Sequence, residues 1–175
     1  MRSAMLLFLL FSVLAGAMDL DLSVSVGPDY ASGGWGDNLS NGILGRIDVC
    51  WKITPSFRAG AGMEASVFGS RYDTDASLSM MMPHVSAGYY LRPGATVFNP
   101  GIEVAGGLAR TSLRSGGGAD PASWDPFWRA GIRWDFSIGA GFRGAAGFDY
   151  SGIVAESKSG DTFGLVFTVS REVSL

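Results

Sequence analysis

The chain has 175 residues with 13 Lys and Arg against 16 Asp and Glu, and no basic run suggests nucleic acid as a partner. Cys50 is the only cysteine, which excludes an intrachain disulfide. One histidine and one cysteine cannot supply a usual transition-metal site, so we expect no metal and no other cofactor.

Residues 1–17 have the three parts of a secretory signal peptide. Arg2 supplies the positive charge, Met5–Leu14 is apolar but too short to span a membrane, and Ala15–Ala17 is a small-residue cleavage site. The alternative is a buried N-terminal helix. Cleavage would leave residues 18–175, or 175 − 17 = 158 residues, which fits one domain. No later apolar run reaches the roughly 20 residues of a membrane helix, so the exported protein would be either soluble or a barrel.

Apolar and polar residues alternate in the rest of the chain, and a period of two indicates β-strands because successive side chains point to opposite faces. Eight strands are predicted, at 19–27, 40–52, 56–68, 77–91, 97–109, 127–136, 138–150 and 162–175. Long polar connections lie at 28–39, 69–76, 110–126 and 151–161, and short turns at 53–56, 92–95 and 135–137. Long loops at one end and tight turns at the other are typical of outer-membrane barrels, with the turns on the periplasmic side.

One face of nearly every strand is charged and glycine-rich, which is unsuited to a dry core. We therefore predict an all-β, eight-stranded antiparallel up-and-down transmembrane barrel, with polar groups in the lumen and apolar groups facing lipid. The alternative is a soluble calyx with its apolar face inside. The predicted lumen holds six charges of each sign: Arg46, Lys52, Arg58, Arg129, Arg133 and Arg143 with Asp21, Asp48, Glu64, Glu103, Asp149 and Glu172.

A neutral set of this kind can pair inside a narrow lumen, where an unpaired charge would be costly. The hairpin through Thr54 and Pro55 places Arg46 about opposite Met63, so we expect Arg46 to pair with Glu64. Arg171 lies on the apolar face, close enough to the chain end to reach the interface. Aromatic residues near both strand ends predict two interfacial girdles.

The fourth strand changes phase. Met80 and Met82 lie on one parity and Val85 and Tyr89 on the other, with Pro83 at the change. Because proline cannot donate to the ladder, we expect a β-bulge there.

The signal peptide, the eight alternating strands and the terminal strand 161–175 resemble the small eight-stranded outer-membrane barrels, such as the OmpA transmembrane domain, OmpX and OmpW. The resemblance covers essentially the whole mature chain. It implies export through the periplasm, insertion in the bacterial outer membrane by the barrel assembly machinery, and contact with outer-membrane lipid and lipopolysaccharide. The terminal strand looks like the signal that the assembly machinery reads.

Some barrels of this size are lipid A deacylases, which carry a His-x-Ser pair with an acidic partner. His84 and Ser86 have that spacing, and Glu103 on the next strand is the available carboxylate. The residues around the pair do not match the family, and Pro83 leaves the facing of His84 open. We therefore expect a lumen residue beside a bulge and no enzyme, with a lipid A-modifying hydrolase as a minor alternative.

The connections predict the functional surface. The glycine-rich segment 115–118 lacks the Gly-Lys-Ser/Thr ending of a phosphate loop. Trp35, Tyr72 and Trp124 are candidate contact residues, although the tryptophans could instead lie in the outer interface. We expect an outer-membrane barrel with a charged, plugged lumen, whose loops contact envelope or host molecules. The alternative is a narrow, OmpW-like passive channel for small or hydrophobic solutes.

Overall fold

The computed structural model describes residues 19–115, 118–119, 122–154 and 159–174. The predicted signal peptide, Leu175 and parts of the connections predicted at 110–126 and 151–161 lie outside these residues. The described residues form eight long strands, one short strand and a 3-10 helix: β1 (Asp19–Ser32), η1 (Gly33–Trp35), β2 (Leu39–Lys52), β3 (Phe57–Ser70), β4 (Ser77–Tyr90), β5 (Asn99–Ser115), β6 (Gly118–Ala119), β7 (Ser123–Gly139), β8 (Phe142–Ile153) and β9 (Gly160–Ser174).

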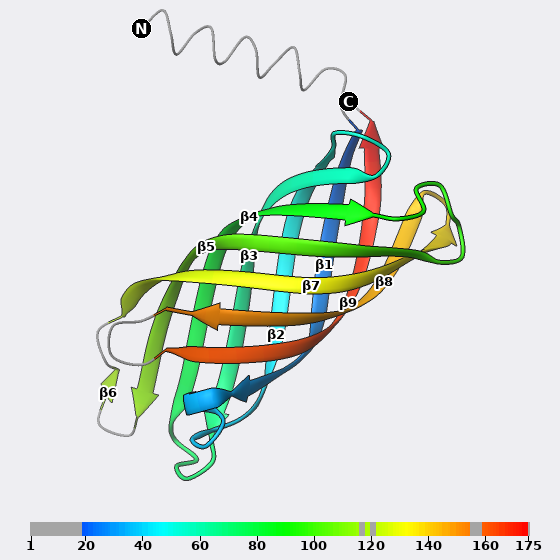
Figure 1. The fold of residues 1–175 in the computed structure, drawn as a ribbon. Helices are drawn as coiled ribbons and strands as arrows, with labels where there is room; N and C mark the ends of the chain where they lie inside the picture. The colour runs from blue at the N-terminus through cyan, green and yellow to red at the C-terminus, as the bar shows by residue number, and fades with distance from the viewer. Residues whose placement is uncertain (1–18, 116–117, 120–121, 155–158, 175) are drawn as a thin grey trace, which may run out of the picture.

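The eight long strands form a closed barrel in which sequential neighbours pair antiparallel (Figure 1). β9 returns to pair with β1, from Asp19 opposite Ser174 to Ser32 opposite Asp161. This closure confirms the predicted up-and-down barrel. The start of β1 and the end of β9 lie at one end with the short turns, which we call the turn end. The opposite end carries η1 and β6 and is called the loop end.

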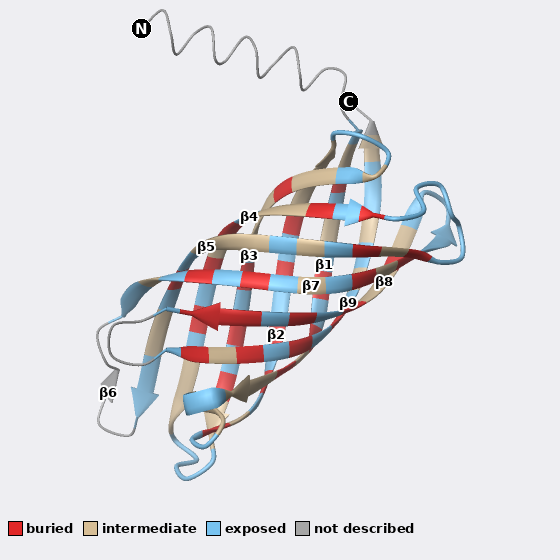
Figure 2. Cartoon of the chain, in the orientation of Figure 1, coloured by how far each residue is buried: buried red, intermediate tan, exposed pale blue. Residues whose placement is uncertain are grey.

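Exposure alternates along the strands, as the coloured bands in Figure 2 show. The outward positions are apolar, and Ile43 and Val85 are 67% and 66% exposed. Such exposure would destabilise a soluble protein, but it suits a wall that faces lipid. The soluble calyx, which needs the apolar face inside, is therefore wrong. Among the described residues no helix is long and apolar enough to cross a membrane.

The predicted bulge at Pro83 is wrong. β4 pairs with β3 in one unbroken register, with Met63 opposite Pro83 and Gly62 opposite His84. On the other side, the pairings of Met81 with Arg110 and of His84 with Gly107 keep the same register. Met80 and Met82 are buried in the barrel on the same parity as His84, so the phase change reflects an apolar stretch of lumen.

The last turn lies later in the chain than predicted. β7 continues through Asp135 to Gly139, and the turn into β8 uses positive φ at Gly139 (101°), Ala140 (53°) and Gly141 (77°). The glycines suit this turn because positive φ costs them no Cβ clash. Asp135, predicted in the turn, instead points into the barrel and is 8% exposed.

Candidate functional site in the barrel lumen

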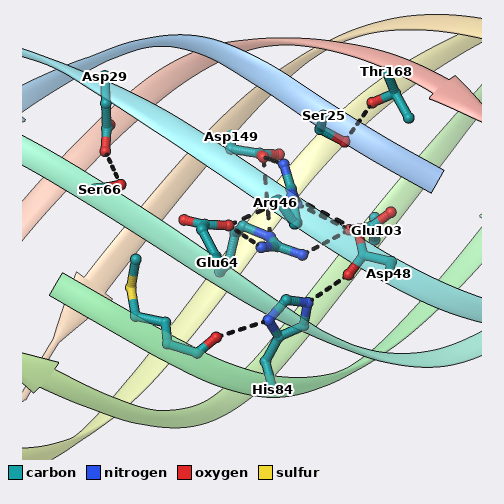
Figure 3. Close-up of polar contacts among 12 residues, drawn as sticks. Ser25, Asp29, Arg46, Asp48, Glu64, Ser66, His84, Glu103, Asp149 and Thr168 are labelled. Carbon is teal, nitrogen blue, oxygen red and sulfur yellow. Dashed lines mark hydrogen bonds and ion pairs between the residues drawn. The ribbon is translucent and has the colours of Figure 1, made fainter.

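A cluster of ion pairs lies in the lumen, and Arg46 of β2 lies at its middle (Figure 3). Its Nη2 donates to Asp149 Oδ2 at 2.7 Å. Its Nη1 lies 3.5 Å from Glu103 Oε1, and its Nε lies 3.5 Å from Glu64 Oε2 and 3.8 Å from Asp48 Oδ2. Only 1% of the Arg46 side chain is exposed, so its charge depends on these carboxylates rather than on water.

Two arginines of β7 complete this central cluster. Arg133 makes a two-pronged contact with Asp149, with Nη1–Oδ1 and Nη2–Oδ2 distances of 2.6 and 2.8 Å. Arg129 donates to Glu64 and, at 2.9 Å, to Glu103. The fork of the guanidinium group allows one arginine to bridge carboxylates from different strands, so the cluster cross-links the walls of the barrel.

His84 joins the cluster at its edge. Nε2 lies 2.8 Å from Asp48 Oδ1 and Nδ1 lies 3.0 Å from the carbonyl of Met82, while the ring meets Phe127 edge-on. Both ring nitrogens are therefore engaged away from Ser86. A base that activates Ser86 would need one of them, so the His-x-Ser pair is not arranged for hydrolysis.

A second set of charges lies nearer the turn end. Arg58 donates to Asp135 at 3.1 Å, lies 3.8 Å from Asp21 Oδ2, and stacks over the Tyr90 ring at 4.0 Å. Arg143 also donates to Asp21. Lys52 and Glu172 pair where the lumen opens.

Two cavities flank this second set. A vestibule of about 560 Å³ opens at the turn end and reaches Arg58 and Asp135. Between that level and the central cluster lies a cavity of about 50 Å³, which Arg58, Asp135 and Arg46 also line. The inner cavity has room for a few water molecules, since one water needs roughly 10–15 Å³ by this measure.

The loop half of the lumen contains a buried apolar cluster, which the sequence analysis missed. The buried cluster consists of Leu39, Phe68, Met80, Met82, Ala109, Phe127 and Ile153, with Ala31, Trp35 and Leu78 packed against it. The sequence did indicate these inward apolar residues, because Met80 and Met82 lie on the same face of the strand as His84. These side chains pack against one another as the residues of a protein core do.

Polar groups in this half are satisfied locally. Asp29 is 2% exposed and accepts a hydrogen bond of 2.9 Å from Ser66. Asp29 and Asp135 are inward carboxylates that the predicted lumen set did not contain. Asp135 was missed because it was assigned to a turn, and Asp29 because it was assigned to a loop.

The predicted lumen residues come together in the structure as two groups. Six of them form the central cluster: Arg46, Glu64, Glu103, Arg129, Arg133 and Asp149. Asp48 links that cluster to His84. The other five belong to the turn-end group: Asp21, Lys52, Arg58, Arg143 and Glu172. Arg46 lies directly opposite Glu64 rather than Met63, one position from the predicted register. Among the described residues no group of three or more His, Cys, Asp or Glu is placed to hold a metal ion.

The three predicted surface contacts lie in different settings. Tyr72 is 81% exposed in the β3–β4 connection. Trp35, in η1, packs inward: a Cβ at Gly160 would lie 1.9 Å from its ring. Trp124 is exposed but does not lie in a loop, because β7 begins one residue before it.

No family model and no curated protein matches the sequence. Solved structures match the fold. Neisserial surface protein A (NspA) aligns with a TM-score of 0.70 at 15% identity, covering 89% of this chain and 97% of that one. Ail, the attachment invasion locus protein of Yersinia pestis, was solved in complex with the heparin analogue sucrose octasulfate. It aligns with a TM-score of 0.55 at 10% identity, covering 90% of this chain and 99% of that one. The N-terminal β-barrel domain of Pseudomonas aeruginosa OprF aligns with a TM-score of 0.55 at 9% identity, covering 86% of this chain and 96% of that one.

At these identities the likeness concerns the fold. The closed barrel, its apolar outer wall and its paired inner charges define a small eight-stranded transmembrane β-barrel. The chain therefore has the fold of the small bacterial outer-membrane barrels, and the outer membrane is the location that this fold implies.

Proposed function

We propose that the protein is an outer-membrane anchor with a closed lumen, which presents its loop end to molecules outside the cell. The observation that carries the proposal is the double closure of the lumen. The Arg46 cluster fills its centre, and the layer containing Phe68 and Met82 fills the loop half. A barrel of eight strands has an interior only wide enough for side chains, which agrees with a plug.

The exposed loop-end surface supports an interactive role. Tyr72 is 81% exposed, and aromatic groups on a rigid scaffold can anchor a partner. NspA is described as a surface protein and Ail as an attachment protein bound to a heparin analogue. By analogy of fold, an envelope or host molecule is the class of partner we propose. Export by the signal peptide in residues 1–17 and assembly by the barrel machinery are parts of the same proposal.

A passive channel is the second candidate, and the vestibule of about 560 Å³ is the observation that favours it. Single-channel conductance of the refolded protein in a planar bilayer separates the two. We expect no discrete conductance steps from the wild-type barrel, because the apolar layer and the ion cluster lie in series. Reproducible steps would overturn the plug and favour the channel.

Location has its own test. The protein should fractionate with outer membrane, and its electrophoretic mobility should change on heating because a closed barrel resists unfolding in detergent. Recovery as a detergent-free periplasmic protein would contradict the proposal.

A further inference from the structure

The ring of His84 faces an acceptor at each of its two nitrogens. Nδ1 lies 3.0 Å from the main-chain carbonyl oxygen of Met82, and Nε2 lies 2.8 Å from Asp48 Oδ1. The side chain has no exposed surface, so these two oxygens are its hydrogen-bond partners. A carbonyl oxygen and an ionised carboxylate can only accept. Because a neutral imidazole carries hydrogen on one nitrogen alone, the two contacts require one proton more than a neutral ring has.

The extra proton belongs on the ring rather than on Asp48. A histidine ring in water holds its second proton up to about pH 6.5, whereas an aspartic acid loses its proton near about pH 3.9. The ring is therefore the stronger base of the two. Arg46 Nε, at 3.8 Å from Asp48 Oδ2, is a second cation beside the same carboxylate, which matches an ionised Asp48.

The charge balance of the central cluster also favours this proton. With Asp48, the cluster holds three guanidinium groups and four carboxylates: Arg46, Arg129 and Arg133 with Glu64, Glu103, Asp149 and Asp48. One negative charge is thus in excess among side chains that are mostly buried, and such an excess is costly. A positive ring at His84 makes the two numbers equal.

Asp48 is the only charged group in contact with the ring among the described residues. On β3 and β5 the residues paired with His84 are Gly62 and Gly107, which bring no side chain. On β7 the ring meets Phe127 edge-on. The next charged inward residues of these strands pair with one another in the central cluster, and β2 adds the thiol of Cys50 beyond Asp48: Glu64, Glu103 and Arg129.

We propose that His84 is held as an imidazolium ion and serves as the fourth cation of the central cluster. The folded barrel then binds one proton that the unfolded chain gives up above about pH 6.5. The stabilisation is complete below that pH and is lost as rising pH removes the proton from the folded ring, because a neutral ring places a lone pair against Asp48. The lumen cluster is therefore a proton-sensitive element of the barrel, whether or not the lumen conducts.

The first measurement is nitrogen NMR of the full barrel, refolded in detergent micelles with isotope-labelled histidine. His84 is the only histidine in the chain, so its two ring signals are assigned at once. We expect both ring nitrogens to be bonded to hydrogen at about pH 7. In Asp48→Asn the carboxylate excess is gone and a side-chain amide can donate to the ring, so one nitrogen should lose its hydrogen at the same pH. Glu172→Gln, which removes a carboxylate where the lumen opens, should give the wild-type signals.

The second measurement compares unfolding in urea across pH. Between about pH 7 and 8 the unfolding equilibrium constant of the wild type should rise about tenfold per pH unit relative to that of His84→Gln, which has no ring proton to lose. Heat-dependent mobility shows whether each variant has folded, and if His84→Gln does not fold, the ring signals decide alone. Three results would each overturn the proposal: a ring nitrogen without hydrogen in the folded wild type, wild-type ring signals in Asp48→Asn, or parallel pH profiles for the wild type and His84→Gln.

Discussion

Arg46 and Glu64 face each other across the β2–β3 pair, with Arg46 Nε 3.5 Å from Glu64 Oε2. Glu64 also accepts from Arg129, and Arg46 also donates to Asp149. The pair is therefore one edge of a network rather than an isolated bridge. Removing one member leaves an unmatched charge among buried side chains.

This arrangement predicts strong coupling between the two sites. Arg46→Ala or Glu64→Ala alone should lower the free energy of unfolding by about 3–5 kcal/mol, because each leaves a buried charge unpaired. The double variant should cost less than the sum of the two. Urea unfolding of the barrel in lipid vesicles measures the cycle, and strictly additive costs would show that the contact carries no coupling.

His84 should behave as a structural partner of Asp48. His84→Ala removes the contact at 2.8 Å and should cost about 1–3 kcal/mol, since a buried carboxylate oxygen loses its partner. Ser86→Ala should cost much less, because no hydrogen bond of its hydroxyl is seen among the described residues. If the wild type instead releases fatty acid from lipid A and both variants lose this activity, the protein is a lipid A hydrolase.

The outer wall should reject charge at mid-height. Ile47→Arg or Val104→Arg places a charge near the bilayer centre and should cost roughly 2–4 kcal/mol. Ser79→Arg is the matched control, since Ser79 lies outward near the loop end of β4 and should tolerate arginine. Equal costs at Ile47 and Ser79 would contradict the inside-out assignment.

Two inward positions are poor controls for that experiment. Ser66 is fully buried and donates to Asp29. A Cβ at Gly107 would lie 2.1 Å from the carbonyl oxygen of Pro83, so even a small side chain forces the backbone to move. We expect Gly107→Thr to be costly, although both residues are on the polar parity.

The apolar layer should contribute as a protein core does. Phe68 is fully buried, and Phe68→Ala should cost about 3–5 kcal/mol through lost contacts and the cavity left behind. Phe167→Ala, on the lipid-facing wall at 58% exposure, should cost less because acyl chains can fill the space. Similar losses at the two sites would show that the loop half of the lumen is loosely packed.

The alternation of residue types by itself determined the barrel class and most of its lumen charges. Arg46, Glu64 and Arg129 could be assigned to one face because a strand has a strict period of two. Charge on that face also decided between lipid outside and water outside. These inferences need only the local chain and the known cost of a charge in lipid.

The tertiary structure decided what a period of two cannot distinguish. Met80 and Met82 are apolar yet point inward, and only barrel closure shows that they pack against Phe68 and Phe127 rather than lipid. The same closure turns Asp135 from an apparent turn residue into the partner of Arg58. Alternation assigns a side chain to a face, but its neighbours come from strands far away in the chain, so pairing and burial emerge only when the sheet closes.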